Sequence, residues 1–498
     1  MFIAYDSKSG IEYAKLCESK REGQKVSKKY VNLGRVLDKK NNIFQNRERG
    51  VFVYNLASNL YENPPENFVP KVKKCNRKES LILDFGDTFF LDNFIRKNGL
   101  NDVINSLGYG NSDTLYSMLN YYVLCNMANC HAEDWWEGNY ARILYPNANL
   151  SSQRISGFLA SIGSENSQRL FFKEYFKLLS NTGIDAKNVL IDSTGLPNDI
   201  HFPLNALVSR NGKINNEVRL IYVVHQKTGL PIYFRYCAGN IVDSMTLIRC
   251  LEELKSQGVD VNFSILDAGY YTVENLREMF EKKISFLTRM TTNLGQYKKL
   301  ISEHFESLQI KENLVEYNGR FVYLKCVKFD FEGHNAFAYI GLDIERKSME
   351  IDKVFRRAKD SKMNAKQVFD AMEKLGAFIL VSSRRIAKEK ILPLYYTRQQ
   401  IEQVFDIGKN YATLLPVRVH SEETFRGHLV LTFLATVIIK LIQAELLKTS
   451  VNPISLFCNL RNQKCKVFDD KIVSGEAFKR VNDCYKLFKI QCPSVIRR

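Results

Sequence analysis

The chain has 498 residues, of which 45% are hydrophobic and 25% are charged, the ordinary composition of a globular protein. This composition excludes a disordered, collagen-like or disulfide-scaffold protein, and the length allows roughly two to four domains. The net charge of +17 indicates a polyanionic partner and carries no information about the fold.

The excess positive charge is concentrated at the two ends of the chain. Residues 1–80 contain 17 basic and 9 acidic side chains, and residues 451–498 contain 10 and 4. We therefore expect a basic, strand-rich segment with a linker over residues 1–80 and a basic tail over residues 449–498. The alternative is that both ends are charged only for solubility.

The cysteines and the apolar segments indicate a soluble protein in a reducing compartment. No signal peptide opens the chain, because Asp6 interrupts it before an apolar core can form. The spacing of Cys125, Cys130 and His131 is atypical of zinc sites, so we expect reduced cysteines in the cytoplasm. The apolar segment Leu429–Ile439 is shorter than the roughly 20 residues of a membrane span, which predicts a buried helix and no membrane.

Residues 81–183 have the apolar spacing of helices and predict a helical region, which would be a DNA-binding region if it contains a helix-turn-helix unit. Cap residues begin one helix near Asn111 and another near Ser151. The second helix is followed by Gly163 and by a further helix rich in phenylalanine. Two helices broken at a glycine are typical of a helix-turn-helix unit and also of a plain helical hairpin.

The remainder of the chain predicts an α/β core in two parts, over residues 184–290 and 376–448. Strands are expected over 188–194, 219–225, 232–238, 263–267, 285–290 and 377–381, with antiparallel and parallel parts. Between the two parts we expect a strand-rich insertion over 291–375, with a hairpin turn at Glu332-Gly333. A long helix from about Pro393 is expected to open the final part of the core.

Two acidic residues are the first candidates for chemistry. Asp192 and Asp267 each follow an apolar strand segment, and ligands bind at the carboxyl edge of α/β sheets. If the two strands are neighbours, both carboxylates enter one site, although either acid alone is also typical of a turn or a helix cap. Four other polar residues are given structural roles. Asp243 is interpreted as a helix cap and Asp199 as a loop residue, and His201 and His225 are interpreted as structural histidines.

The helix predicted around Glu402 supplies a second group of candidates. Arg398 and Glu402 are four residues apart and lie on one helical face. Tyr395 and Lys409 fall on the same side. A surface helix laced with salt bridges has the same pattern, so the spacing alone leaves both interpretations open.

The four residues have the spacing of a known signature: Tyr395, Arg398, Glu402 and Lys409. This signature resembles that of bacterial insertion-sequence transposases of the "insertion sequence four" superfamily. The Asp-Ser-Thr segment at Asp192 and the Asp-Ala-Gly-Tyr segment at Asp267 are similar to the first and second catalytic motifs of that family. The resemblance extends over residues 10–450.

The resemblance implies an RNase H-like catalytic core with an Asp-Asp-Glu triad. Asp192, Asp267 and Glu402 would be the catalytic residues and would hold two Mg²⁺ or Mn²⁺ ions. Carboxylate oxygens are ligands that these ions prefer. Two such ions can serve the attacking and the leaving oxygen of an in-line displacement.

The resemblance also implies the partners of the protein. Tyr395, Arg398 and Lys409 would contact DNA near the scissile phosphate. The protein would be a cut-and-paste transposase that binds the terminal inverted repeats of its element and target DNA, as a homodimer, in the bacterial cytoplasm at the nucleoid. Some members cut through a DNA hairpin with a base held on an aromatic ring, but the tryptophans, Trp135 and Trp136, precede the core.

Two other functions remain open at this point. One is a metal-dependent nuclease of the same fold that hydrolyses DNA without joining it. The other is a catalytically silent protein that only binds element ends.

Overall fold

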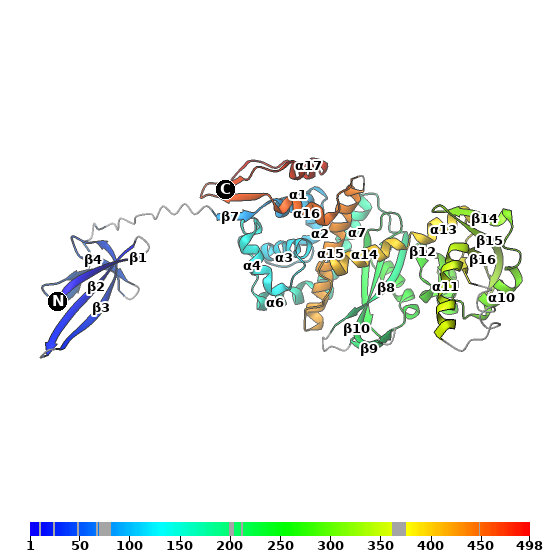
Figure 1. Ribbon diagram of the computed structural model, residues 1–498, viewed down its shortest axis with the longest axis horizontal. Coiled ribbons are helices and arrows are strands. Elements are labelled where there is room, and N and C mark those ends of the chain that lie inside the picture. The colour runs from blue at the N-terminus through cyan, green and yellow to red at the C-terminus, as the bar shows by residue number, and fades with distance from the viewer. Residues whose placement is uncertain are drawn as a thin grey trace. The chain divides into compact units, whose positions relative to one another are not determined.

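The computed structural model describes residues 1–498 except for 9–10, 23–24, 47–48, 66–67, 69–80, 199–203, 211–212, 361–374 and 448. Asp199 and His201 therefore lie outside the described residues. The chain divides into two compact units, Met1–Ser80 and Leu81–Arg498 (Figure 1). Each unit is described by itself.

Unit 1 is one antiparallel sheet of six strands. The strands are β1 Phe2–Lys8, β2 Ile11–Glu22, β3 Lys25–Asp38, β4 Ile43–Asn46, β5 Gly50–Asn55 and β6 Leu60–Glu62. Each strand pairs with the next along the chain. The inner face carries a small core of its own: Ala14, Leu16, Leu33, Phe44, Phe52 and Tyr54.

Unit 2 is built on a sheet of ten strands. These are β8 Asn188–Pro197, β9 Ala206–Arg210, β10 Lys213–His225, β11 Pro231–Ala238, β12 Phe263–Leu266, β13 Ser285–Arg289, β14 Leu314–Tyr317, β15 Arg320–Phe331, β16 His334–Asp343 and β17 Ala377–Ser382. Their order is β11-β10-β8-β12-β13-β17-β16-β15-β14, and β9 pairs with β10. The strands β8, β12 and β13 are parallel and the other pairs are antiparallel, so the α/β class expected from the sequence is confirmed.

One detail of the sheet differs from the expectation, and a second was not predicted from the sequence. β8 continues past Asp192 to Pro197, because β10 pairs with it as far as Glu217↔Pro197, so Asp192 lies inside the strand and not at its end. The segment 291–375 does not form a separate strand-rich layer. Its strands join the core sheet where β16 pairs with β17, and it also contains α10 Gly295–His304 and α11 Ile344–Asp360.

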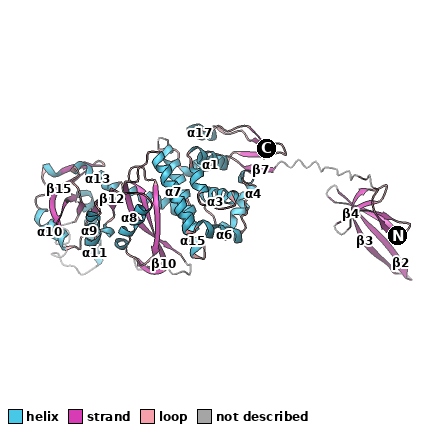
Figure 2. Ribbon diagram, turned by 180° about the vertical axis from the view of Figure 1, so that it is seen from behind, coloured by secondary structure: helices cyan, strands magenta, loops and turns pink. Residues whose placement is uncertain are grey.

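Helices pack around this sheet, and the part of unit 2 that precedes β8 in the chain is mainly helical (Figure 2). The first group is α1 Gly86–Lys97, α2 Leu100–Asn105, α3 Ser112–Leu124, α4 Ala132–Gly138, α5 Ala141–Leu144, α6 Ser152–Ile162 and α7 Glu165–Asn181. The later helices are α8 Leu247–Ser256, α9 Val273–Glu281, α13 Lys388–Tyr396, α14 Gln399–Asn410, α15 Glu422–Leu446, α16 Pro453–Arg461 and α17 Lys479–Leu487. The long helix expected from Pro393 is thus two helices, which are separated at Thr397 and Arg398.

The helix α15 is the central element of the helical part. Its 25 residues are long and apolar enough to cross a membrane by length and composition, but 78% of its most apolar window is buried inside the protein. It crosses α6 closely, because a Cβ added at Gly427 would lie 2.0 Å from the carbonyl oxygen of Leu159. The buried helix expected over 429–439 is therefore present, and it is longer than that segment.

The C-terminal residues form a folded lobe where a tail was expected. β7 Leu81–Asp84 pairs with β18 Lys464–Val467, which continues through β19 Lys471–Ser474 to β20 Val495–Arg497. A separate small core supports this four-stranded sheet: Leu83, Phe85, Tyr140, Cys465, Val467 and Ile472. The sequence of 449–498 is basic, but many of its apolar residues are buried, among them Leu456, Leu460 and Ile472.

Candidate active site

Two of the predicted acids are brought together by parallel strand pairing. β8 and β12 pair in a register that places Ile191 beside Leu266, so the next residue on each strand, Asp192 and Asp267, follows at the same level. Asp267 directly follows β12, and its carbonyl oxygen accepts a hydrogen bond from Thr288 Oγ1 at 3.2 Å. The two carboxylates therefore share one side of the sheet edge, as the sequence predicts for neighbouring strands.

Arg398 connects the third acid to the first two. Its Nη1 lies 3.0 Å from Asp192 Oδ2 and 3.6 Å from Asp267 Oδ1, and its Nη2 lies 3.1 Å from Glu402 Oε1. Arg398 is the residue that precedes α14, and Glu402 lies in the first turn of that helix. One guanidinium thus contacts three carboxylates that come from β8, from the end of β12 and from α14.

The three acids differ in their exposure to solvent. The side chain of Asp192 is 14% exposed, whereas those of Asp267 and Glu402 are 41% and 57% exposed. Burial raises the pKa of Asp192 to about 7, and the neighbouring Asp267 adds to the shift, against the hydrogen bond from the Ser193 backbone N–H and the charge of Arg398. Asp192 is therefore the acid that most depends on a nearby positive charge.

The pKa of Arg398 is shifted by the same neighbouring carboxylates. Burial alone would lower the pKa of its guanidinium, but the carboxylates of Asp267 and Asp192 reverse that effect and raise it. The result is a compact cluster in which one cation balances several anions. Such a cluster attracts further cations more strongly once the arginine moves away.

The other two residues of the predicted motif lie on either side of this cluster. Tyr395, in the last turn of α13, lines the same cavity as Asp267 and Glu402. Burial raises the pKa of its hydroxyl to about 12, so it is a neutral hydrogen-bonding group. Lys409 Nζ donates a 2.6 Å hydrogen bond to Thr194 Oγ1, two residues beyond Asp192 on β8. The structure therefore brings all six sequence-predicted residues to one edge of the sheet.

The cavity at this edge has a volume of about 480 Å³ and contains two cations that the sequence analysis missed. Arg289 is the last residue of β13, the third parallel strand, so the rule that identified Asp267 could have found it. Arg346 comes from α11 and also pairs with Glu350 at 2.7 Å. An opening lined by both acids and arginines suits a phosphate beside bound cations.

Asp243 has a different role from the helix cap expected of it. No side-chain cap is formed where it begins a short 3-10 helix, Asp243–Met245. Instead its Oδ1 accepts hydrogen bonds from Ser193 Oγ and from Arg219 Nη1. Gly269 also packs against this carboxylate, so Asp243 supports the backbone on both the Asp192 and the Asp267 side of the site.

Two other polar groups considered in the sequence are structural. His225 Nδ1 lies 2.8 Å from Thr228 Oγ1, and burial lowers the pKa of this histidine, which is typical of a neutral core residue. Cys125 is buried and Cys130 is exposed. Within the described ranges, neither belongs to a group of metal-binding side chains.

The donor set of the acid cluster fits divalent metal ions in its chemistry. Three carboxylates in one opening offer the oxygen ligands that Mg²⁺ and Mn²⁺ take. Among the described residues, however, no three His, Cys, Asp or Glu side chains are already gathered around one point. In this cluster Arg398 lies between the carboxylates, so metal binding requires its guanidinium to move aside.

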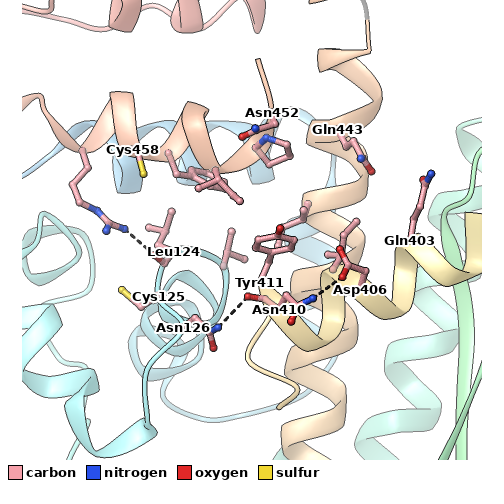
Figure 3. Close-up of a pocket in the computed structure, with 17 residues that line it drawn as sticks. Leu124, Cys125, Asn126, Gln403, Asp406, Asn410, Tyr411, Gln443, Asn452 and Cys458 are labelled. Carbon is pink, nitrogen blue, oxygen red and sulfur yellow. Dashed lines mark hydrogen bonds between the residues drawn. The ribbon is translucent and has the colours of Figure 1, made fainter. Parts of the chain in front are cut away.

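A second cavity, of about 480 Å³, lies on the adjoining flank of α14 (Figure 3). Asn126 Nδ2 donates to the carbonyl oxygen of Asn410 at 3.0 Å, and Asn410 in turn donates to Asp406. On the opposite wall, Arg461 pairs with Asp87 and donates to the carbonyl oxygen of Leu124. The Asn126 hydrogen bond attaches the C-terminal end of α14, the helix that carries Glu402, to the helical region, and the Arg461 contacts attach α16 to the same region.

One comparison with known proteins assigns a family to the region around this site. A family model described as "Transposase DDE domain" matches residues 185–438, slightly more than half of the chain. No curated protein matches the sequence. One similar solved structure is described as a piggyBac transposase synaptic complex with hairpin DNA. It shares 10% sequence identity, the match covers 75% of this chain and 70% of that chain, and the TM-score is 0.35.

Proposed function

The chain belongs to the transposase DDE domain family, and from this premise we propose that Asp192, Asp267 and Glu402 are the triad of a DNA transposase. The observation that carries the proposal is the three-way contact of Arg398, which joins these acids at distances of 3.0 to 3.6 Å. The family match spans all three acids and Arg398.

The sheet supports an RNase H-like core for this family member. A three-stranded antiparallel meander, β8, β10 and β11, is extended at β8 by the parallel strands β12 and β13. The first two acids lie on the two central neighbours of this arrangement. The spacing of Tyr395, Arg398, Glu402 and Lys409 supports assignment to the "insertion sequence four" superfamily.

The family is metal-dependent, and we propose two Mg²⁺ or Mn²⁺ ions held by Asp192, Asp267 and Glu402. When bound, such ions activate water or a DNA 3′-hydroxyl and stabilise the departing oxygen. The residues of the chain position the reactants. Arg398 holds the carboxylates together before the ions bind and is then free to contact a phosphate.

The remaining cations would orient the DNA end. Lys409 donates a hydrogen bond to Thr194, and Arg289 and Arg346 line the cavity that contains Asp267 and Glu402. Tyr395 remains neutral and can donate a hydrogen bond to a phosphate oxygen. Positioning and electrostatic stabilisation are the main contributions a protein makes to phosphoryl transfer.

We further propose the partners that the sequence predicts. The substrate would be the terminal inverted repeats of the element, bound through the basic N-terminal segment and the helical region, followed by target DNA. The working form would be a homodimer on paired ends in the bacterial cytoplasm, at the nucleoid. We propose cut-and-paste transfer as the reaction on these substrates.

One experiment separates this function from the alternatives. Purified protein is incubated with labelled duplexes that carry the element ends, with target DNA and Mg²⁺ or Mn²⁺, and the products are resolved on a denaturing gel. A transposase gives cleaved ends and joined products. Cleaved ends without joined products would indicate a nuclease, and binding without cleavage would indicate a silent end-binding protein; either result would contradict the proposal.

A further inference from the structure

The strands β2 and β3 extend beyond the sheet of unit 1 as a two-stranded ribbon. They pair with each other from Tyr13↔Arg35 to Glu22↔Lys25. β1 leaves β2 after Cys17, and β4 pairs with β3 only from Arg35 onward. Over residues 18–22 and 25–32 the two strands therefore have no third neighbour, and the hairpin projects from the body of the sheet (Figures 1 and 2).

The two faces of this ribbon differ in character. Residues that alternate along a strand, and residues directly opposite on paired strands, share a face. One face continues the small core through Ala14, Leu16 and Leu33. The other, which we call the outer face, carries the buried Cys17 and five exposed side chains by the register Lys15↔Asn32, Cys17↔Tyr30 and Ser19↔Lys28: Lys15, Ser19, Lys28, Tyr30 and Asn32.

The outer face is positively charged and can form many hydrogen bonds. Lys15 and Lys28 form no ion pair with any described residue, and none of the five side chains is acidic. Tyr30 is 58% exposed, so its ring and its hydroxyl group are open to a partner. By contrast, Lys29 on the other face lies opposite Glu18, and Lys39 elsewhere in unit 1 pairs with Glu12 at 2.6 Å.

We propose that the outer face of the β2–β3 ribbon enters the major groove of the double-stranded DNA that the protein acts on. The major groove of B-DNA admits a two-stranded β-ribbon. Lys15 and Lys28 contact phosphates on the groove walls, and Tyr30 and Asn32 lie toward the base edges. The net charge of +8 over residues 1–80 draws this unit to DNA. The inference rests on the proposed function and names the surface that recognises the substrate.

The shape of the ribbon also selects among nucleic acids. The major groove of A-form RNA is deep and narrow, and side chains do not read it. A double-stranded RNA of the same sequence should therefore compete poorly. Equal competition by that RNA would contradict insertion into the groove.

The first test measures salt dependence on the full-length chain. Binding of a fluorescent element-end duplex is followed by anisotropy in EDTA, so that no DNA is cut, over salt concentrations from about 50 to 200 mM. Lys15→Ala and Lys28→Ala should each reduce the slope of log K against log salt by ~0.9, the value for one lost phosphate contact. Lys39→Ala is the matched control and should leave the slope unchanged, because Lys39 is already paired with Glu12.

The second test measures sequence selectivity and the groove. Tyr30→Ala should reduce the ratio of affinities for the element end and a scrambled duplex by about tenfold, at an unchanged salt slope. Methyl green, a major-groove ligand, should displace the protein, whereas the minor-groove ligand distamycin should not. Circular dichroism and the melting temperature of each variant test whether it is folded. The charge-conserving variant Lys28→Arg should retain the wild-type salt slope.

The outcomes separate this proposal from the proposed function. If the wild-type protein binds and joins element ends but the lysine variants have its salt slope, the ribbon is not the contact surface and the transposase function stands. If the wild-type protein binds no element end in EDTA, the assigned substrate itself is wrong. Displacement by distamycin alone would overturn insertion into the major groove.

Discussion

The acid cluster and the interior around α15 differ in how the charge of an ionisable side chain is accommodated. In the cluster, Asp192, Asp267 and Glu402 are balanced by one arginine that contacts all three. In α15, His428 is buried between the hydroxyl of Tyr122 and the carbonyl of Leu414, and burial lowers its pKa to about 4. The acid cluster contains charged groups whose contacts with one another can be replaced by contacts with metal ions and phosphates. The interior around α15 contains a histidine that is neutral, so α15 packs there without a buried charge at His428.

The largest expected effect comes from removing a charge in the acid cluster. Asp192→Asn should lower the rate of end cleavage by about 10³-fold, because a carboxamide cannot hold a divalent ion as a carboxylate does. DNA binding in EDTA should remain. The rate is measured on labelled element ends with Mg²⁺, and Asp185→Asn, an exposed acid just before β8, is the matched control. Retention of more than a tenth of the wild-type rate would remove Asp192 from the triad.

A second substitution tests the rigid packing of α15. Gly427→Ala places a methyl group 2.0 Å from the carbonyl oxygen of Leu159, which should lower the free energy of unfolding by about 3 kcal/mol. Gly157→Ala on the opposing helix α6 meets no atom within 4 Å and should stabilise by about 0.5 to 1 kcal/mol. Thermal unfolding of both variants measures the difference. Equal stability of the two would mean that the helices can separate at little cost.

The pH dependence of stability sharpens the same contrast. The unfolded chain takes up a proton on His428 near pH 6.5, whereas burial holds the folded pKa near 4. At this side chain the unfolded state therefore binds more protons between these values, so the contribution of His428 to stability is lost as the pH falls from 6.5 toward 4. Between pH 6.5 and 5 the loss from this group is about 2 kcal/mol.

The check is a series of denaturant titrations across that pH range. His428→Gln should lack this component of the pH dependence, although it will be less stable overall. His131→Gln alters an exposed histidine that pairs with Asp134 and serves as the control. A wild-type and a His428→Gln protein with parallel pH profiles would show that the buried imidazole is not the titrating group.

The smallest expected effect concerns the exchange of Arg398 for metal. Arg398→Gln leaves three carboxylates without their shared cation, so Mg²⁺ should bind to the DNA-free protein about tenfold more tightly, which corresponds to about 1.4 kcal/mol. The rise in melting temperature during a Mg²⁺ titration measures this. Arg385→Gln, an exposed arginine outside the cluster, should titrate like the wild type. Weaker Mg²⁺ binding by Arg398→Gln would show that the arginine supports the metal site and does not compete for it.

Local sequence patterns predicted most of the residues in the site. The apolar strand segments before Asp192 and Asp267 and the four-residue spacing from Arg398 to Glu402 are both local signals, and the contacts among these residues are those that the patterns require. The position of Asp192 within β8 could not be inferred in this way. It depends on the length of β10, a partner strand whose outer end is polar and gives no apolar signal.

Long-range contacts explain what the sequence did not reveal. Aspartate is a residue type that often caps helices, so the sequence around Asp243 predicts a cap. Its hydrogen bonds with Ser193 and Arg219 form only when β8 and β10 are paired. Arg289 ends β13, and Asp267 directly follows β12. An arginine at the end of a strand is not a metal ligand, so the search for acidic residues did not predict Arg289 as part of the site. The break between α13 and α14 lies at Thr397 and Arg398, which are ordinary helical residues by propensity.

The pairing of β7 with β18 has a consequence for synthesis of the protein. Asp84 and Lys464, which pair across these strands, are 380 residues apart in the sequence. At ordinary ribosomal rates β7 leaves the ribosome about 20 to 80 seconds before its partner strand. A message with a premature stop before Lys464 therefore yields a chain with an open strand edge at β7. Such truncated chains are expected to be preferred substrates for cellular proteases, so that mainly full-length protein persists.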